Sequence, residues 1–332
     1  MQVTKRCAPM IKNRLGVLGR GMRLPMVAAP MFLVSGPELV VAACRSGIAG
    51  AMPTTNARTV QDLERALQFI TRELDAYSAT AGRPAAPWIL NLITHSSYDR
   101  LSQELALVSR YRPPVVITAL GSPAPAVETV HAYGGLVLAD VNNLSFARKA
   151  AAAGVDGLIL VSAGAGGHTG RVAAAPFVAA VREFFGGIIG VSGGICSGAT
   201  VRAAELIGAD LACAGTPFIV AAESAASPAY RGMVTRATLD DLVLSKAFTG
   251  AEAYYLRESI IAAGLDPDHL VGKEKFEIKN SESQVKAWKD IWSAGQGVGC
   301  ITAIESTAEI VARFEREYAA AVAWPPFVGD FS

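Results

Sequence analysis

The sequence predicts an α/β protein, a (β/α)8 TIM barrel with a C-terminal helical cap over its catalytic face. Short runs of Ile, Val, Leu and Ala stop at loops of small residues, as strands buried on both faces of a parallel sheet do. Segments with helical periodicity separate these runs, and eight strand–helix units can be counted. Right-handed crossovers with helices of this length favour a closed barrel over an open, doubly wound sheet.

The predicted strands are short and apolar. They span residues 24–31, 48–54, 88–94, 113–121, 135–141, 157–161, 188–192 and 211–215. The first helix is opened by Ser35 or Gly36 as its cap and by Pro37 in its first turn, where no N–H is needed. The next helices are expected at 62–74, 96–111, 126–134 and 144–154.

A weak internal repeat supports this order of elements. Three Ala-rich helices end at a glycine, Gly47, Gly154 or Gly208, and each leads at once into a buried strand. The sequence therefore predicts a barrel domain over residues 1–219. Residues 220–290 are expected to form the helical cap or insertion, and residues 291–332 a glycine-rich loop followed by a closing helix.

Composition narrows the choice of partners. Of the 332 residues, 51% are hydrophobic and 30 basic residues face 29 acidic ones, so bulk charge indicates neither a nucleic-acid nor an anionic-membrane partner. The five cysteines lie far apart with no CxxC pair, which predicts neither a disulfide framework nor a metal site. The N-terminal residues lack the apolar core of a signal peptide, and no apolar run is long enough to span a bilayer. We therefore expect a cytoplasmic protein.

Two glycine loops follow consecutive strands of the predicted barrel. Ser192, Gly193, Gly194 and Ile195 form the first loop, and Gly215 with Thr216 forms the second. Their backbone N–H groups, each followed by a helix, match what a phosphate site after the last two barrel strands requires. Either loop alone could be a tight turn, but two loops on neighbouring strands favour phosphate binding.

His168 lies in the run GAGGHTG, at the mouth of the sixth strand. Because the glycines on both sides have no side chains, the imidazole would be accessible from the cavity. Its unperturbed pKa of about 6.5 suits a general base. The other histidines, His95, His131 and His269, have no such setting and are taken as surface or core residues. The run does not match GxGxxG, so a nicotinamide-binding Rossmann domain is not expected.

Six motifs occur together in one order: AAPM, NL, GAGGHTG, SGGI, AGTPF and IWSAGQGVG. In this order and spacing the chain resembles the nitronate monooxygenase family, formerly called 2-nitropropane dioxygenases. The resemblance implies a TIM barrel with a helical cap that binds FMN without covalent attachment. The flavin-dependent enoyl-acyl-carrier-protein reductases and some NADH:quinone reductases share these motifs.

The resemblance also implies roles for residues. Gly194, Gly215 and Thr216 would hold the FMN phosphate, and His168 would be the base or the hydrogen-bond donor that faces the substrate. The remaining cofactor residues would lie along the loops and around the flavin ring: Met31, Asn91, Gly166, Gly167, Ser192, Gly193, Ser293, Gly295 and Gln296. Two departures stand out, because Pro217 replaces the family's Arg and Asp140 with Val141 occupies the place where many relatives carry a Lys.

The implied activity is oxidation of alkyl nitronates, and of nitroalkanes if they are accepted, with O2 to a carbonyl compound and nitrite. The partners would be this small-molecule substrate and O2, and the oligomeric state is left open, with a homodimer as one option. Two other functions stay open: an NAD(P)H-dependent flavin reductase acting on quinones or enoyl-acyl substrates, and a non-catalytic barrel that binds flavin or a phosphometabolite.

Overall fold

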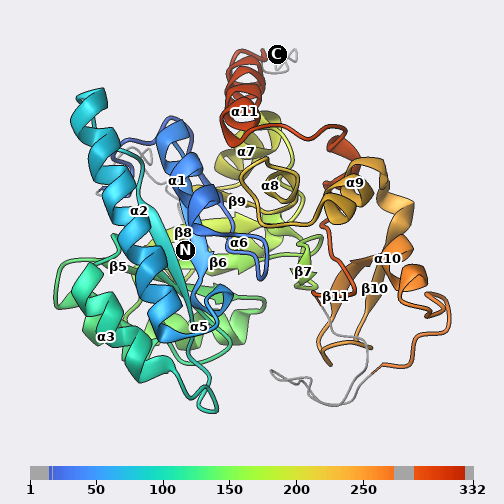
Figure 1. Cartoon of the computed structure of the whole chain (residues 1–332), viewed down its shortest axis with the longest axis horizontal. Helices are drawn as coiled ribbons and strands as arrows, with labels where there is room; N and C mark the ends of the chain where they lie inside the picture. The colour runs from blue at the N-terminus through green and yellow to red at the C-terminus, as the bar shows by residue number, and fades with distance from the viewer. Residues whose placement is uncertain (1–14, 17, 273–287, 326–332) are drawn as a thin grey trace, which may run out of the picture.

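The computed structural model describes residues 15, 16, 18–272 and 288–325, and much of the charged stretch expected in the cap lies outside these ranges. Eight parallel strands form a closed barrel, in the order β1-β2-β3-β4-β5-β6-β8-β9, with β9 paired back to β1. The strands are β1 Met26–Ala28, β2 Ala49–Pro53, β3 Trp88–Ile93, β4 Val115–Ala119, β5 Leu136–Val141, β6 Gly157–Val161, β8 Ile188–Ser192 and β9 Leu211–Ala214. The predicted (β/α)8 fold is confirmed (Figure 1).

Helices follow the barrel strands and cover the outside of the barrel. They are α1 Pro37–Ser46, α2 Val60–Ala81, α3 Leu101–Tyr111, α4 Ala124–His131, α5 Leu144–Ala152, α6 Ala174–Arg182, α7 Gly198–Leu206 and α8 Thr216–Ile219. Gly47, Gly154 and Gly208 have φ of 90°, 85° and 99°, the left-handed conformation that a glycine adopts most easily after a helix. The helix-stop signals in the sequence were therefore interpreted correctly.

The inside of the barrel is filled by alternate strand residues. Val27, Ala49, Ile89 and Leu138 belong to one buried apolar cluster inside the ring, while the intervening residues pack outward against the helices. Because side chains alternate along a strand, a residue two positions beyond an inward-facing one also faces inward. Two polar residues stand at such positions near the carboxyl ends of their strands, Asn91 on β3 and Asp140 on β5.

The segment after the barrel strands contains helices, as a helical cap requires, and also two strands that were not expected from the sequence. It contains α9 Pro228–Arg236, β10 Leu242–Ser245, β11 Ala253–Leu256 and α10 Arg257–Ala262. β11 pairs antiparallel with β10 on one side and on the other with β7, the two residues Gly167–His168 of the glycine loop. The two strands pair with each other over four residues, and the distant β7 extends the sheet by two more residue pairs. Figure 1 shows this unit beside the barrel, joined to it through β7.

The last helix, α11 Thr307–Val322, returns to the barrel wall, where it packs against α7 and α1 (Figure 1). The backbones of α7 and α11 meet at Gly198, where a Cβ would lie 2.0 Å from the Phe314 carbonyl oxygen. Gly198 N–H also donates to Glu317 Oε2 over 2.8 Å. None of the helices in the described ranges combines the length and the apolar character needed to cross a bilayer.

Candidate active site

The late glycine-rich loop lies directly against the loops of the barrel mouth. Gly295 N–H donates to Thr216 Oγ1 over 2.9 Å, and Gln296 N–H donates to the Gly164 carbonyl oxygen, also over 2.9 Å. A Cβ on Gly166 would lie 2.7 Å from Gly295 N, so two backbones approach here without room for a side chain. The loops after β6 and β9 and the late loop therefore form one assembly.

The loops after β1, β6, β8 and β9 meet in the same region. A Cβ on Gly215 would stand 3.4 Å from Met31 Sδ, so the methionine predicted to contact the flavin packs beside the second glycine loop. Ser192 O accepts hydrogen bonds from Ser162 N–H at 2.9 Å and from Ser162 Oγ at 2.5 Å. Gly193 has a φ of 119°, and a Cβ there would lie 2.6 Å from Ser162 Oγ. Glycine at position 193 is therefore required by packing as well as by conformation.

The N-terminus of α7 is already occupied by protein groups. Ser197 Oγ accepts from Thr200 N–H over 3.2 Å, while Thr200 Oγ1 accepts from the N–H groups of Cys196 and Ser197, each over 3.0 Å. The Gly198 N–H is bound by Glu317. A phosphate at this point would have to displace these bonds and approach a carboxylate. The prediction placed the phosphate donors in the glycine loop that precedes this helix, and the contacts at the helix end leave that prediction open.

The turn just before that helix is different. Within the described residues, the N–H groups of Gly194 and Ile195 make no hydrogen bond to protein. Gly194 has a φ of 71°, and a Cβ built on it would meet no atom within 4 Å, so the turn borders open space. Successive N–H groups around residues of positive φ form a concave anion-binding backbone. The residues present thus fit a phosphate that is held by the turn itself.

His168 is partly buried at the edge of the cap sheet, where its ring meets side chains of the cap. It pairs with Ala253 of β11, and its Nε2 lies 3.0 Å from Thr249 Oγ1. The Trp288 ring packs edge-on to the imidazole at 5.5 Å between centroids. Burial among these groups lowers the pKa of His168 from 6.5 to about 4, because the charged form is poorly solvated. The expected pKa near 6.5 is corrected, and the side chain is neutral at pH 7.

The Ser293 hydroxyl links the glycine loop to the cap through two hydrogen bonds. Its Oγ accepts from Gly167 N–H over 2.6 Å and donates to the Tyr254 carbonyl oxygen over 2.5 Å. The Gln296 side chain is exposed, and its Nε2 donates to the Tyr254 hydroxyl over 2.9 Å. The Ser293 hydroxyl is therefore committed within the protein, whereas Gln296 lies at the surface of the same assembly.

Asn91 and Asp140 face the inside of the barrel, near the carboxyl ends of β3 and β5. β3 stands opposite β8 in the strand order, and Asn91 Nδ2 donates to the Ile117 carbonyl oxygen over 3.3 Å. Burial raises the pKa of Asp140 to about 7 and also raises the pKa of the neighbouring Cys213 thiol. Where many relatives carry a lysine, this protein has a carboxyl group that titrates near neutrality. Pro217, in place of the family's arginine, lies buried in the first turn of α8, where its missing N–H leaves no bond unmade.

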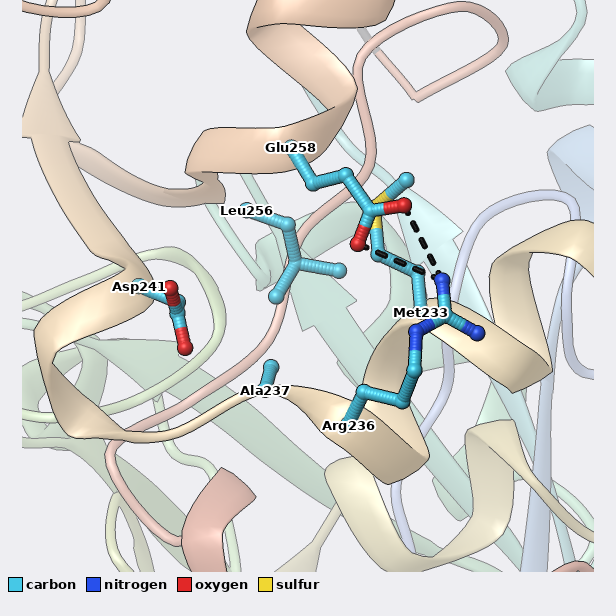
Figure 2. Close-up of a pocket in the computed structure, with 6 residues that line it drawn as sticks. All are labelled: Met233, Arg236, Ala237, Asp241, Leu256 and Glu258. Atoms are coloured by element: carbon cyan, nitrogen blue, oxygen red, sulfur yellow. Dashed lines mark hydrogen bonds and ion pairs between the residues drawn. The ribbon is translucent and has the colours of Figure 1, made fainter.

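A small pocket of about 90 Å³ lies in the cap, between α9 and the end of β11 (Figure 2). An ion pair of 3.0 Å between Arg236 and Glu258 crosses it. Its lining consists of Met233, Arg236, Ala237, Asp241, Leu256 and Glu258. None of these residues belongs to the predicted site, so the glycine-loop assembly remains the candidate active site.

Three residues of the cluster that includes His168 could not be recognised from the sequence. Thr249, Tyr255 and Trp288 come from separate cap segments that only the fold brings together. Asp140 could have been noticed, because in LVLADV it occupies the same alternating face as two leucines.

A closed (β/α)8 barrel with glycine loops at the carboxyl ends of its last strands is typical of enzymes that bind a phosphate-bearing ligand at the barrel mouth. Residues 20–317 match the family described as Nitronate monooxygenase, and the chain belongs to this family. It is accordingly a flavin-dependent oxidoreductase.

Comparison with individual proteins agrees with this assignment. A nitronate monooxygenase of Paraburkholderia phytofirmans is 26% identical over 341 residues, which cover 90% of this chain and 93% of the relative. A putative monooxygenase of Mycobacterium tuberculosis is 29% identical over 220 residues, but this match spans only 61% of this chain and 59% of that protein. A solved nitroalkane oxidase from Streptomyces ansochromogenes has a TM-score of 0.71 at 22% identity, covering 91% of this chain and 97% of that one, which supports the fold.

Proposed function

We propose that this protein is an FMN-dependent nitronate monooxygenase, which oxidises alkyl nitronates with O2 to a carbonyl compound and nitrite. Membership of the family supports the reaction class. The observation that carries the choice of substrate is the burial of His168, which keeps its imidazole neutral.

The glycine-loop assembly would hold FMN. Gly194 and Ile195 offer backbone donors for its phosphate, and Met31 beside Gly215 offers an apolar contact for its ring. Bound FMN would supply the electron-accepting chemistry and the reaction with O2. The protein itself would supply orientation and hydrogen bonds at fixed positions.

The lowered pKa of His168 favours an anionic substrate. A base is most effective when its pKa lies near the working pH, and burial moves His168 from 6.5 to about 4. The difference of about 2.5 pKa units corresponds to about 3.4 kcal/mol of lost proton affinity. A neutral nitroalkane must lose a proton to such a base, whereas a nitronate arrives without that proton. A neutral imidazole can still donate a hydrogen bond to the nitronate oxygen, so we infer a preference for the nitronate.

The experiment compares the two forms of one nitro compound. Purified protein is given nitroethane either as the freshly dissolved neutral nitroalkane or as the nitronate formed beforehand with base. Nitrite release and O2 consumption are then measured together. We expect the nitronate to react with a higher kcat/KM than the neutral form, and denatured protein to release FMN. A protein that releases no FMN and cannot be reconstituted with it would contradict the cofactor proposal.

His168→Asn tests the role of the imidazole in the same assay. We expect this variant to keep FMN, because no donor of the glycine loops is changed, and to lose turnover of the nitronate. Loss of only the neutral nitroalkane reaction would instead identify His168 as a base. If neither form reacts in the wild-type protein while NADH is consumed with an added quinone, the proposed oxidation is wrong and the flavin reductase is the function.

A further inference from the structure

Two cysteines from distant parts of the chain have their thiols in contact. Cys196 follows directly after the turn at Gly194 and Ile195, and Cys300 ends the short 3-10 helix Val298–Cys300 of the late loop. Their Sγ atoms are 3.1 Å apart, although the two residues are 104 positions apart in sequence. Cys196 is 7% exposed and Cys300 is exposed, so one member of the pair is open to reagents in solution.

The backbone around the two thiols holds them together. Cys196 N–H donates to Thr200 Oγ1 over 3.0 Å. A Cβ on Gly297 would lie 2.6 Å from Cys196 Cβ, so the late loop packs directly against the Cys196 side chain. Val298 and Ile301 belong to a buried apolar cluster with residues of α8 and α9. Because the fold already brings the two sulfur atoms together, their reaction with each other is effectively unimolecular.

The pair lies between two parts of the candidate active site. On one side is the turn at Gly194 and Ile195, which borders open space. On the other side is the late loop, which is hydrogen-bonded to the loops after β6 and β9 through Gln296 and Gly295. Within the described residues, no backbone hydrogen bond joins the late loop to the turn itself. A bond between the two sulfur atoms would therefore supply a link that the backbone does not make.

Cys300 is the thiol that starts the reaction, because burial, together with the adjacent Cys300 thiol, raises the pKa of Cys196 to about 12. The Cys300 thiolate attacks one sulfur of oxidised glutathione, which forms a mixed disulfide and releases one glutathione thiolate. Cys196 then gives its proton to water, and its thiolate attacks Cys300 Sγ and releases the second glutathione. Two protein thiols are thereby oxidised to one disulfide, while one oxidised glutathione is reduced to two thiols.

Two buried cysteines provide internal controls. Cys44 is 1% exposed and its thiol donates to the Pro87 carbonyl oxygen over 3.4 Å, and Cys213 is 4% exposed. Burial raises the pKa of Cys44 to about 12 and also raises the pKa of Cys213. Thiols that are buried and protonated are inert toward reagents in solution. Oxidation of the folded protein should therefore leave both of them unchanged.

We propose that Cys196 and Cys300 form a redox-sensitive modification site, where a disulfide fastens the late loop to the turn at Gly194 and Ile195. Formation of the bond does not depend on the ligand that the turn holds. The inference rests on the proposed function in one respect, because FMN whose phosphate lies on this turn should leave more slowly when the late loop is covalently attached to it.

The first test identifies the bond. Cys7 lies outside the described residues, so every protein in the test carries Cys7→Ser. The flavin-loaded protein is treated with oxidised glutathione, free thiols are alkylated, and the digested peptides are identified by mass spectrometry. We expect one disulfide, between Cys196 and Cys300, with Cys44 and Cys213 alkylated only after unfolding. Cys196→Ser should stop at a glutathione adduct on Cys300. The same adduct, or two free thiols, in the protein that retains Cys196 would overturn the proposal.

The second test measures the consequence for the turn. The rate of FMN release on dilution is followed by the rise in flavin fluorescence, in the oxidised protein and after reduction. We expect release to be about tenfold slower with the disulfide, because the linked loops must part before the ligand leaves. Cys300→Ser is the matched control, and oxidised glutathione should not slow its release of FMN. Equal rates in the oxidised and the reduced protein, or equal slowing in Cys300→Ser, would overturn the proposed link.

The two readouts separate the possible failures. If the disulfide forms in a protein that neither binds FMN nor oxidises nitronates, the modification site is supported and the proposed function is contradicted. If the protein binds FMN and oxidises nitronates while the thiols of Cys196 and Cys300 stay free, the modification site is refuted and the proposed function is intact.

Discussion

The buried neutral state of His168 predicts a specific acid sensitivity. Burial lowers its pKa from 6.5 to about 4 in the folded protein, so the unfolded chain binds the proton more tightly. The contribution of His168 to the free energy of unfolding is fully present above pH 6.5, falls as the pH decreases from 6.5 to 4, and is constant below that. By linkage, the loss amounts to about 2 kcal/mol at pH 5 and about 3.4 kcal/mol at its limit.

The substitution His168→Asn removes this titration. We expect the wild-type protein to lose about 2 kcal/mol more than the variant between pH 8 and pH 5, measured by urea unfolding at each pH with the flavin removed. The control is His269→Asn, because His269 is exposed and its pKa is raised by Asp266, so its titration has the opposite sign. Parallel pH profiles for wild type and His168→Asn would refute the buried, neutral imidazole and with it the argument for a nitronate substrate.

Three further predictions follow from other parts of the molecule. Burial raises the pKa of Asp140 to about 7, so ionisation of this carboxyl group lowers the free energy of unfolding as the pH rises from 3.8 to 7. Asp140→Asn should therefore raise the Tm more at pH 8 than at pH 5, and an equal rise at both would contradict this. Gly194→Ala should fold at a cost of about 1 kcal/mol and bind FMN more weakly in fluorescence titration, whereas Gly193→Ala should lower the Tm further; unchanged FMN affinity in Gly194→Ala would place the phosphate elsewhere. Cys196 Sγ and Cys300 Sγ are 3.1 Å apart, so oxidised glutathione should form a disulfide seen by intact mass, and Cys300→Ser should abolish it; retention of both thiols would count against this geometry.

The barrel could be predicted because its signals are local. Each buried strand is a short apolar run, and Gly47, Gly154 and Gly208 mark helix ends by a conformation that depends on one residue. The strands β10 and β11 could not be predicted in the same way. Residues 253–256 pair on one side with β10 and on the other with β7, and nothing within the segment itself shows that second, distant partner.

In the candidate site, too, the features that depend on local sequence could be predicted and those that depend on distant residues could not. The glycine loops were found from sequence because close backbone contacts, such as Gly166 against Gly295, exclude every other residue type. The chemical state of His168 could not be predicted, because Thr249 and Trp288, which contact its ring, come from segments far from it in sequence. The sequence identifies the residue at each position, but it does not show how far the fold removes that residue from water.

The position of α11 has a consequence for the order in which the protein folds. This helix completes the barrel wall between α7 and α1, yet the whole cap segment is synthesised before it. Ile310, Val311 and Phe314 are fully buried there, so their partners on the barrel stay uncovered until the ribosome has released residues beyond 314. Contacts between elements this far apart in sequence form slowly because a long loop must be closed first. A chain in synthesis would thus expose one apolar side of an otherwise assembled ring of strands, a surface that chaperones recognise.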